Sequence, residues 1–473
     1  MNESSAGWHP LFRRLDALLL AVLLLARIRI DSLAEAAVLP LRQGDVTRHW
    51  LLGRLLSPDA MRLLAQQETI DPIGLLIIVA ALGCLLAYLL VDEFVRNERG
   101  RHRAKLALIF LIILLTVFLP SLKLILLRQA SGPASYCHDG GVIQTEATID
   151  YLLAGRNPYI EDYVNTPMAE WGINEFRTAL YHYPYLPWTF LFSAPFKLAS
   201  EAILGWYDQR FVYLLLFALT LLLLPRLAGT RTRSLLLVMV VGLNPLMGTD
   251  LIYGQNDSFV LAWIVLSLWL WARGRAAGPP GGNFWRVAAA ITFGLACASK
   301  PTAWFLAPFY LVWIVGSETE SAGAFLRKAV HLAWPALAAM LLVTGPYLVW
   351  SPGAMFDDVW KWSAGTSETA YQIWGWGASN LVLAFGWVKS RFDAWPFLIA
   401  ELLVGIPLMA ALLWRQWREN RLGRVLWGYG LFLFAFFFVS RFLNENYLGY
   451  ILAFLALGAL VREDAGDRTA NEG

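Results

Sequence analysis

Long apolar runs recur along almost the whole chain and are separated by short polar or cationic stretches. A helix that crosses a bilayer needs roughly 20 mostly apolar residues. Residues 72–91 and 106–127 meet this length, and 211–224 is shorter but almost wholly apolar. The pattern predicts about 11–13 spans in all. The further runs are 17–30, 234–247, 259–271, 287–298, 303–315, 330–349, 395–414, 425–439 and 447–461.

The composition also indicates a protein that crosses the membrane many times. Hydrophobic residues make up 58% of the 473 residues and charged residues only 15%, whereas soluble domains carry about 25% charged residues. The net charge of +3 is too small to indicate a nucleic-acid partner, and three cysteines make no disulfide framework. We therefore expect an all-α, polytopic transmembrane helix bundle that forms a single domain over residues 1–473.

Arginine and lysine gather in short connectors between the apolar runs, at 96–105, 226–233, 273–286, 327–328 and 415–424. Such connectors favour the cytoplasmic side of a membrane. This topology places the loops 128–185, 248–257, 299–302, 350–394 and 440–446 outside and makes 462–473 a polar cytoplasmic tail. The segment 186–200 is interrupted by Pro195 and Lys197. If this segment crossed the membrane fully, the cationic connector at 226–233 would lie outside. The segment therefore fits the predicted topology only as a re-entrant or half-span segment.

The main external loop, 128–185, carries the first polar group that suggests chemistry. His138 and Asp139 precede a stretch, 141–154, whose pattern predicts a short amphipathic helix. Glu146 follows Asp139 by seven residues and Asp150 follows Glu146 by four. A helix reaching back to Asp139 would place all three carboxylates on one face. Exposed helix faces often carry carboxylates that are merely solvated, and this explanation stays open.

Three more polar groups lie at the predicted outer ends of spans. Each has an ordinary explanation, because tight turns favour Gly, Asn and Asp and a lysine at a helix end often reaches the interface. Their location on one face nevertheless favours a functional site, since ionisable residues in membrane segments are costly. The groups contain Gln255, Asn256 and Asp257; Lys300; and Arg441 and Asn446.

Tryptophans are frequent in the second external loop, 350–394. Interfacial tryptophan belts and sugar-stacking platforms both account for them, and the sequence does not separate the two uses. They are Trp350, Trp360, Trp362, Trp374 and Trp376.

Several catalytic and cofactor motifs are absent from the sequence. It contains no GxxxxGK[ST] phosphate loop, no HExxH and no GxSxG, and its six histidines have no metal-ligand spacing. We therefore expect no cofactor, while a divalent-cation requirement stays open.

The order of the polar motifs resembles the GT-C superfamily of integral membrane glycosyltransferases. An early acidic loop is followed by LLAGRNPY at 152–159, YHYPYLPWTFLFSAPF at 181–196, Gly-Gln-Asn at 254–256 and Gly-Leu-Ala…Ser-Lys-Pro at 294–301. The pattern is most similar to the polyprenyl-phosphate-mannose-dependent mannosyltransferases. It covers roughly residues 136–308, and 441–447 agrees with it. The two spans before residue 106 are extra relative to the simplest version of the pattern.

The resemblance implies transfer of mannose or a similar hexose from a polyprenyl-phosphate donor to a lipid or glycan acceptor. It places a multi-pass protein in the cell membrane, with an inverting reaction on the non-cytoplasmic side. Asp139 matches the family's loop aspartate and is expected to be the general base. Lys300, Arg441, Gln255 and Asn256 are expected to bind the donor phosphate or sugar. Supporting or acceptor-binding residues are expected among His138, Glu146, Asp150, Tyr183, Asp257 and Asn446.

Two other functions are compatible with a polytopic bundle. A transporter or flippase would carry charges at mid-span and two related halves with interrupted helices, whereas the polar groups here lie toward one face. A ligase or polymerase of polyprenyl-linked glycans usually has its large external loop late in the chain, whereas the candidate loop here is early.

Overall fold

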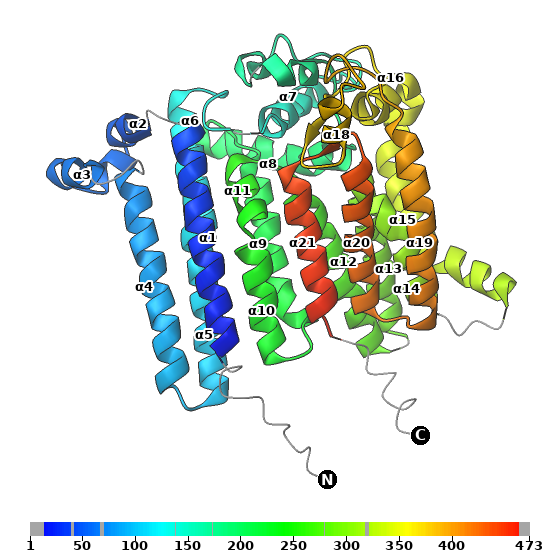
Figure 1. The fold of residues 1–473 in the computed structure, drawn as a ribbon, viewed down its shortest axis with the longest axis horizontal. Helices are drawn as coiled ribbons and strands as arrows, with labels where there is room; N and C mark the ends of the chain where they lie inside the picture. The colour runs from blue at the N-terminus through cyan, green and yellow to red at the C-terminus, as the bar shows by residue number, and fades with distance from the viewer. Residues whose placement is uncertain are drawn as a thin grey trace.

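The computed structural model describes residues 14–38, 42–66, 71–137, 139–172, 174–278, 280–316 and 321–462. Nearly all of this part is helical, and the long helices run side by side in one bundle (Figure 1). Short helices and loops cover one end of the bundle. The expected all-α, polytopic bundle is confirmed.

The N-terminal helices form one side of the bundle. Asp71 caps the second long helix, α4 (Pro72–Phe94), by accepting the Gly74 amide at 2.9 Å, and Pro72 takes the first helical position. A continuous apolar helix from Glu98 to Ser131 follows. The elements are α1 (Leu15–Val38), α2 (Arg42–Arg48), η2 (Leu52–Arg54), α3 (Pro58–Ala65), α4 (Pro72–Phe94), α5 (Glu98–Ile113), the π-helical η3 (Leu114–Phe118) and α6 (Leu119–Ser131).

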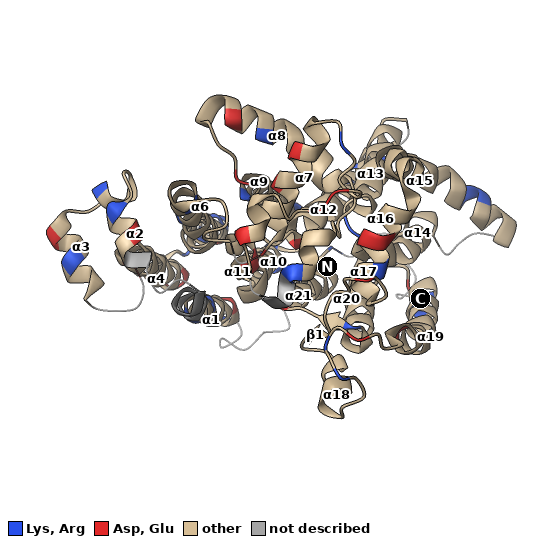
Figure 2. Cartoon of the chain, turned by 90° about the horizontal axis from the view of Figure 1, so that it is seen from above, with Lys and Arg blue, Asp and Glu red and all other residues tan. Residues whose placement is uncertain are grey.

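The main external loop forms a cap over the bundle. It contains α7 (Gly141–Leu153), η4 (Pro167–Glu170) and η5 (Asn174–Tyr181), and α8 (Trp188–Leu204) follows it. The amphipathic pattern at 141–154 thus predicted α7 correctly. The helix does not reach Asp139, which lies in the preceding turn, so the three carboxylates of this loop do not share one helix face. Seen from above, α8 lies across the end of the bundle (Figure 2), as expected for a segment that does not cross fully.

The central helices build most of the core. The helices α10 (Arg231–Gly242) and α11 (Pro245–Tyr253) form a bent pair. Asn244 caps α11 by accepting hydrogen bonds from two backbone amides, and Gly254, with φ +97°, ends α11. The elements are α9 (Arg210–Leu227), α10 (Arg231–Gly242), α11 (Pro245–Tyr253), α12 (Asp257–Ala277), α13 (Gly282–Cys297), η6 (Pro301–Leu306), α14 (Ala307–Val315) and α15 (Ala322–Trp350).

The C-terminal segment adds the second external loop and three long helices. Two short parallel strands join this loop to the connection before the last helix, with Trp374 opposite Phe442 and Gly375 opposite Leu443. The elements are α16 (Pro352–Phe356), the π-helical η7 (Asp357–Lys361), α17 (Trp362–Ala364), β1 (Trp374–Gly375), α18 (Ser379–Ala384), α19 (Phe397–Arg418), α20 (Leu422–Val439), β2 (Phe442–Leu443) and α21 (Glu445–Leu460).

Within the described residues, seven helices are long and apolar enough to cross a membrane, or eight if the α10–α11 pair, bent by 47°, counts as one span. These seven are α4, the continuous α5–α6 helix, α9, α12, α15, α19 and α20. The apolar segments Pro301–Val315 and α21 are shorter. The sequence estimate of 11–13 is larger because it included short runs and the charged α1, which lie alongside the candidate spans (Figure 1).

The cationic connectors meet at the end of the bundle opposite the cap. Arg231 lies 4.0 Å from Glu98, and the backbone of Ala228 pairs with that of Val461. At the other end, the Leu186 amide donates to the Ser299 carbonyl at 3.0 Å. These contacts place the connectors at 96–105 and 226–233 together at one end, and Leu186 beside Ser299 at the other. Most of the predicted tail, 463–473, lies outside the described residues.

Candidate active site

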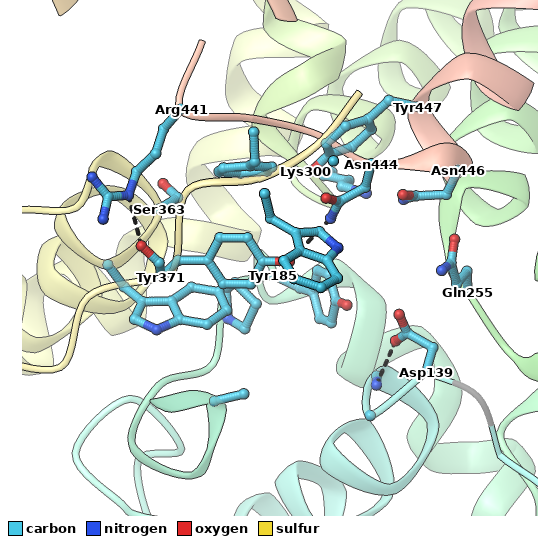
Figure 3. A pocket seen from close by; sticks show the side chains of 18 of the residues that line it. Asp139, Tyr185, Gln255, Lys300, Ser363, Tyr371, Arg441, Asn444, Asn446 and Tyr447 are labelled. Carbon is cyan, nitrogen blue, oxygen red and sulfur yellow. Dashed lines mark hydrogen bonds between the residues drawn. The ribbon is translucent and has the colours of Figure 1, made fainter. Parts of the chain in front are cut away.

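A cavity of about 1400 Å³ lies where the predicted outer loops meet. It brings together five residues from separate parts of the chain, namely Asp139, Gln255, Lys300, Arg441 and Asn446. Figure 3 shows Asp139, Gln255 and Asn446 on one side of the cavity and Arg441 on the other. The structure therefore gathers most of the polar groups that the sequence placed on one face.

Asp139 is held in the turn before α7. Its Oδ1 accepts the Gly141 amide at 2.6 Å. Gly141 has no space for a side chain, because a Cβ there would lie 2.6 Å from Asp139 Oδ1 and 2.8 Å from the Tyr185 hydroxyl. The carboxylate and the phenol thus converge beside the same glycine, and both residues line the cavity.

Lys300 is part of a buried polar chain. Its Nζ lies 2.7 Å from Asp257 Oδ1 and 3.3 Å from Asn256 Oδ1. The Asn446 amide donates to the other oxygen of Asp257. The Lys300 ammonium also lies 4.9 Å from the centre of the Tyr447 ring. Asn256 and Asp257 do not line the cavity themselves, so they orient Lys300 and Asn446, which do.

Arg441 clamps the second external loop. Its guanidinium donates to the carbonyl oxygens of Tyr371 at 2.6 Å, Asp393 at 2.9 Å and Arg391 at 3.2 Å. Among the described residues, no carboxylate lies within ion-pair distance of it. Burial lowers the pKa of Arg441 to about 10, which leaves it charged at neutral pH. Arg441 lines the cavity, but its donors are occupied by the loop backbone.

A family comparison matches the central part of the chain. Residues 152–316 match the MptA/B family, described as alpha-(1->6)-mannopyranosyltransferase, N-terminal domain. This segment is a mannosyltransferase domain. It contains Gln255 and Lys300, whereas Asp139 precedes it and Arg441 and Asn446 follow it. The match confirms the resemblance to the polyprenyl-phosphate-mannose-dependent GT-C mannosyltransferases over this segment, which is a hexosyltransferase domain. No curated protein and no solved structure matches the chain.

Aromatic side chains form a large part of the cavity wall. Four of the five tryptophans noted in the second external loop line it, Trp360, Trp362, Trp374 and Trp376. The fifth, Trp350, is exposed at the end of α15 and does not.

Two other aromatic residues of the wall, Tyr185 and Tyr371, were not among the expected site residues. Burial and the nearby charge of Asp139 raise the pKa of both phenols well above its usual value. They remain neutral hydrogen-bond donors at neutral pH.

Several expected site residues lie away from the cavity. Glu146 forms an ion pair with Arg128 at 2.7 Å, and Asp150 forms one with Lys197 at 2.7 Å. Tyr183 is fully buried in an aromatic cluster beneath the cap. His138 lies outside the described residues. The partners of Glu146 and Asp150 come from other helices, so their spacing along α7 does not reveal them.

One side-chain group beside the cavity has the composition of a metal site. His182, Asp357 and Asp358 place ligand atoms within 4.8 Å of one another, and it is the one such group in the part of the chain that the structure describes. The two nitrogens of His182 are already hydrogen-bonded, to Asp358 at 2.8 Å and to Thr369 at 2.6 Å. The group therefore satisfies its own polar atoms and joins the two external loops.

Proposed function

We propose that the mannosyltransferase moves mannose from a polyprenyl-phosphate donor to a hydroxyl of a lipid or glycan acceptor, with Asp139 as general base. The observation that carries this proposal is the convergence of Asp139, Gln255, Lys300 and Asn446 on one cavity. The cavity exceeds the roughly 300–1,000 Å³ of ordinary small-molecule pockets. Its size suits two substrates held at once.

The reaction we propose is an inverting displacement. The acceptor oxygen attacks C1 of the donor sugar while its proton passes to the Asp139 carboxylate. The bond between C1 and the phosphate oxygen breaks, and polyprenyl phosphate leaves with the bonding electrons. The Gly141 amide fixes Oδ1 of Asp139, so the geometry of the base is set before the substrates bind.

The leaving phosphate gains negative charge as the bond breaks. Lys300 is the cation at the cavity wall on the Asp139 side, and its Nζ is held by Asp257. An ammonium held in advance stabilises this charge without reorganisation. Gln255 and Asn446 add amide groups on the same side (Figure 3). Arg441 contributes positive charge from the opposite wall.

The lipid part of the donor needs an apolar path into the cavity. One part of the lining consists of large apolar side chains from η6, α19 and α20, with Phe305, Leu398 and Phe436 among them. We assign the prenyl chain to this part of the wall. The tryptophans of the second external loop supply flat faces for the sugar rings of a glycan acceptor.

The charge distribution suggests the orientation in the membrane. The arginine-rich connectors lie at the end opposite the cavity and favour the cytoplasm. We therefore propose a multi-pass protein of the cell membrane with its active site on the non-cytoplasmic side. A lipid-linked donor suits that side because no nucleotide sugar is required there.

A transfer assay with purified protein tests this function. The protein is offered polyprenyl phosphates that carry different sugars, and mannosylated acceptor and released polyprenyl phosphate are measured. The wild type is expected to use the mannosyl donor, and Asp139→Asn to lose about 10²–10⁴-fold in kcat, the usual contribution of a general base. Wild-type turnover by a folded Asp139→Asn variant would remove Asp139 from the mechanism. Movement of the donor across vesicles without bond cleavage would show a flippase instead.

A further inference from the structure

Arg210, the first residue of α9, is fully buried behind the cavity and does not line it. Its Nε and Nη2 donate to the two oxygens of Asp208 at 2.9 and 2.7 Å. Its Nη1 donates to two backbone carbonyls, Tyr136 at 3.0 Å and Ile252 at 3.1 Å. One guanidinium group therefore connects a buried carboxylate to two separate backbone segments.

These two segments carry functional groups of the cavity. Tyr136 precedes Asp139 by three residues, and Ile252 precedes Gln255 by three. Tyr136 has φ +57°, which makes it the one non-glycine residue with positive φ in the described ranges. A bulky residue adopts this conformation only where its surroundings enforce it. The hydrogen bond from Arg210 to the Tyr136 carbonyl helps to hold Tyr136 in this conformation.

The second segment packs directly on Arg210. Gly254 has φ +97°, and a Cβ there would lie 3.3 Å from Cγ of Arg210 and 2.0 Å from Cγ2 of Val142. The backbone before Gln255 is thus fixed between Arg210 on one side and α7 on the other. A direct hydrogen bond between the two segments, from the Asp139 amide to the Tyr253 carbonyl, is long at 3.5 Å.

Arg210 belongs to a buried network of ion pairs that includes Asp208 and Arg128. Asp208 also accepts from Arg128 at 2.8 Å, and Arg128 forms an ion pair with Glu146 of α7. Burial opposes ionisation of Asp208, but the charges of Arg210 and Arg128 hold its pKa well below its ordinary value. Two cations and two anions therefore balance inside the cap. Such a network is costly to break because each remaining charge would be buried and unpaired.

We infer that Arg210 is a positioning residue, whose Nη1 sets the spacing between the Asp139 segment and the Gln255 segment on one side of the cavity. The inference rests on the proposed transferase function. A displacement of about 1 Å at a catalytic group costs about 10²-fold in rate. Arg210 therefore acts on turnover through Asp139 while touching neither substrate.

Arg210→Lys tests the inference while keeping the charge beside Asp208. A lysine cannot supply the planar set of donors that serves Asp208 and both carbonyls together. We expect kcat to fall about 10²-fold in folded protein, with the KM for the polyprenyl-phosphate mannose donor within a few-fold of wild type. Hydrogen exchange in residues 136–141 and 252–256 should increase. Added methylguanidinium should restore part of the activity of Arg210→Ala.

Lys105→Gln is the matched control, because Lys105 is a similarly buried cation that lies 2.8 Å from Asp16 at the opposite end of the bundle. It should lower stability without raising exchange in the two cavity segments. Unchanged exchange there in Arg210→Lys, or a kcat loss no greater than the loss of folded protein, would overturn the inference. Hydrogen exchange is measured without any transfer reaction. It therefore tests the positioning role of Arg210 even if the wild type fails to transfer mannose.

Discussion

Nζ of Lys300 lies 2.7 Å from Oδ1 of Asp257, and both side chains are more than nine-tenths buried. The cation expected to act on the leaving phosphate is therefore paired with a carboxylate of the protein. Removing one partner of such a buried ion pair strongly destabilises a protein, because the remaining charge is buried without a partner. Loss of stability alone thus cannot identify the role of Lys300.

Comparison of Lys300→Met with Asp257→Asn separates the catalytic role from the structural one. If the ammonium stabilises the leaving phosphate, Lys300→Met loses about 10²–10³-fold in kcat. Asp257→Asn, which keeps the ammonium, loses much less. Both variants should melt at lower temperature than the wild type. Equal kcat losses in the two variants would mean that the pair only supports the fold.

Gly141→Ala should impair turnover while leaving the bundle intact. The added Cβ would approach both Asp139 Oδ1 and the Tyr185 hydroxyl to less than 3 Å, so the carboxylate or the phenol must move. We expect kcat to fall roughly 10²-fold, measured in the mannose transfer assay. Gly345→Ala is the control, since a Cβ at Gly345 of α15 meets nothing within 4 Å. Full activity in Gly141→Ala would show that the site tolerates this movement.

The sequence predicted the features that depend on local pattern and on topology. Apolar runs marked the long helices, and the arginine-rich connectors placed the loops at one end. Once the loops share an end, residues as distant as Asp139 and Asn446 can line one cavity. This is why four of the five expected catalytic and donor-binding residues line it, the fifth being Asn256, which lies behind Lys300.

Side-chain partners could not be predicted in the same way. Glu146 lies 18 residues from Arg128 in the chain, and their pairing results from the packing of α7 against the end of α6. Tyr371 enters the cavity because β1 pairs with β2, an arrangement of two residues in each strand that leaves no periodic signal. Arg210 and Asp208 appear in the sequence only as two charges between apolar segments.

Arg441 is expected to matter first for stability. Its three hydrogen bonds to Tyr371, Arg391 and Asp393 hold the second external loop against the bundle. Hydrogen bonds from a charged donor contribute about 1.5–3 kcal/mol each. Arg441→Gln should therefore destabilise the protein by about 2–4 kcal/mol, measured by thermal unfolding in detergent. An unchanged melting temperature combined with a raised donor KM would instead show that the guanidinium serves the donor directly.

Asp358 of the second external loop binds residues 182 and 183 of the main external loop, and this contact predicts how stability depends on pH. Asp358 accepts from the Tyr183 amide at 2.9 Å and lies 2.8 Å from Nδ1 of His182. Burial raises the pKa of Asp358 from 3.8 to about 6, despite the opposing hydrogen bond from His182. Between these values the folded protein holds a proton that the unfolded chain has lost, so stability falls as the pH rises from about 4 to about 6.

Asp358→Asn removes this titration while preserving the shape of the side chain. The shift of Asp358 corresponds to about 3 kcal/mol at 1.36 kcal/mol per pKa unit, taken as an upper bound. Thermal unfolding of both proteins should show the wild type losing stability relative to Asp358→Asn between pH 4 and pH 6, and a constant difference above about pH 7. Groups far from Asp358 have the same surroundings in both proteins, so the difference reports the site around Asp358. Parallel stability curves over this whole range would mean that Asp358 is ionised in the folded protein.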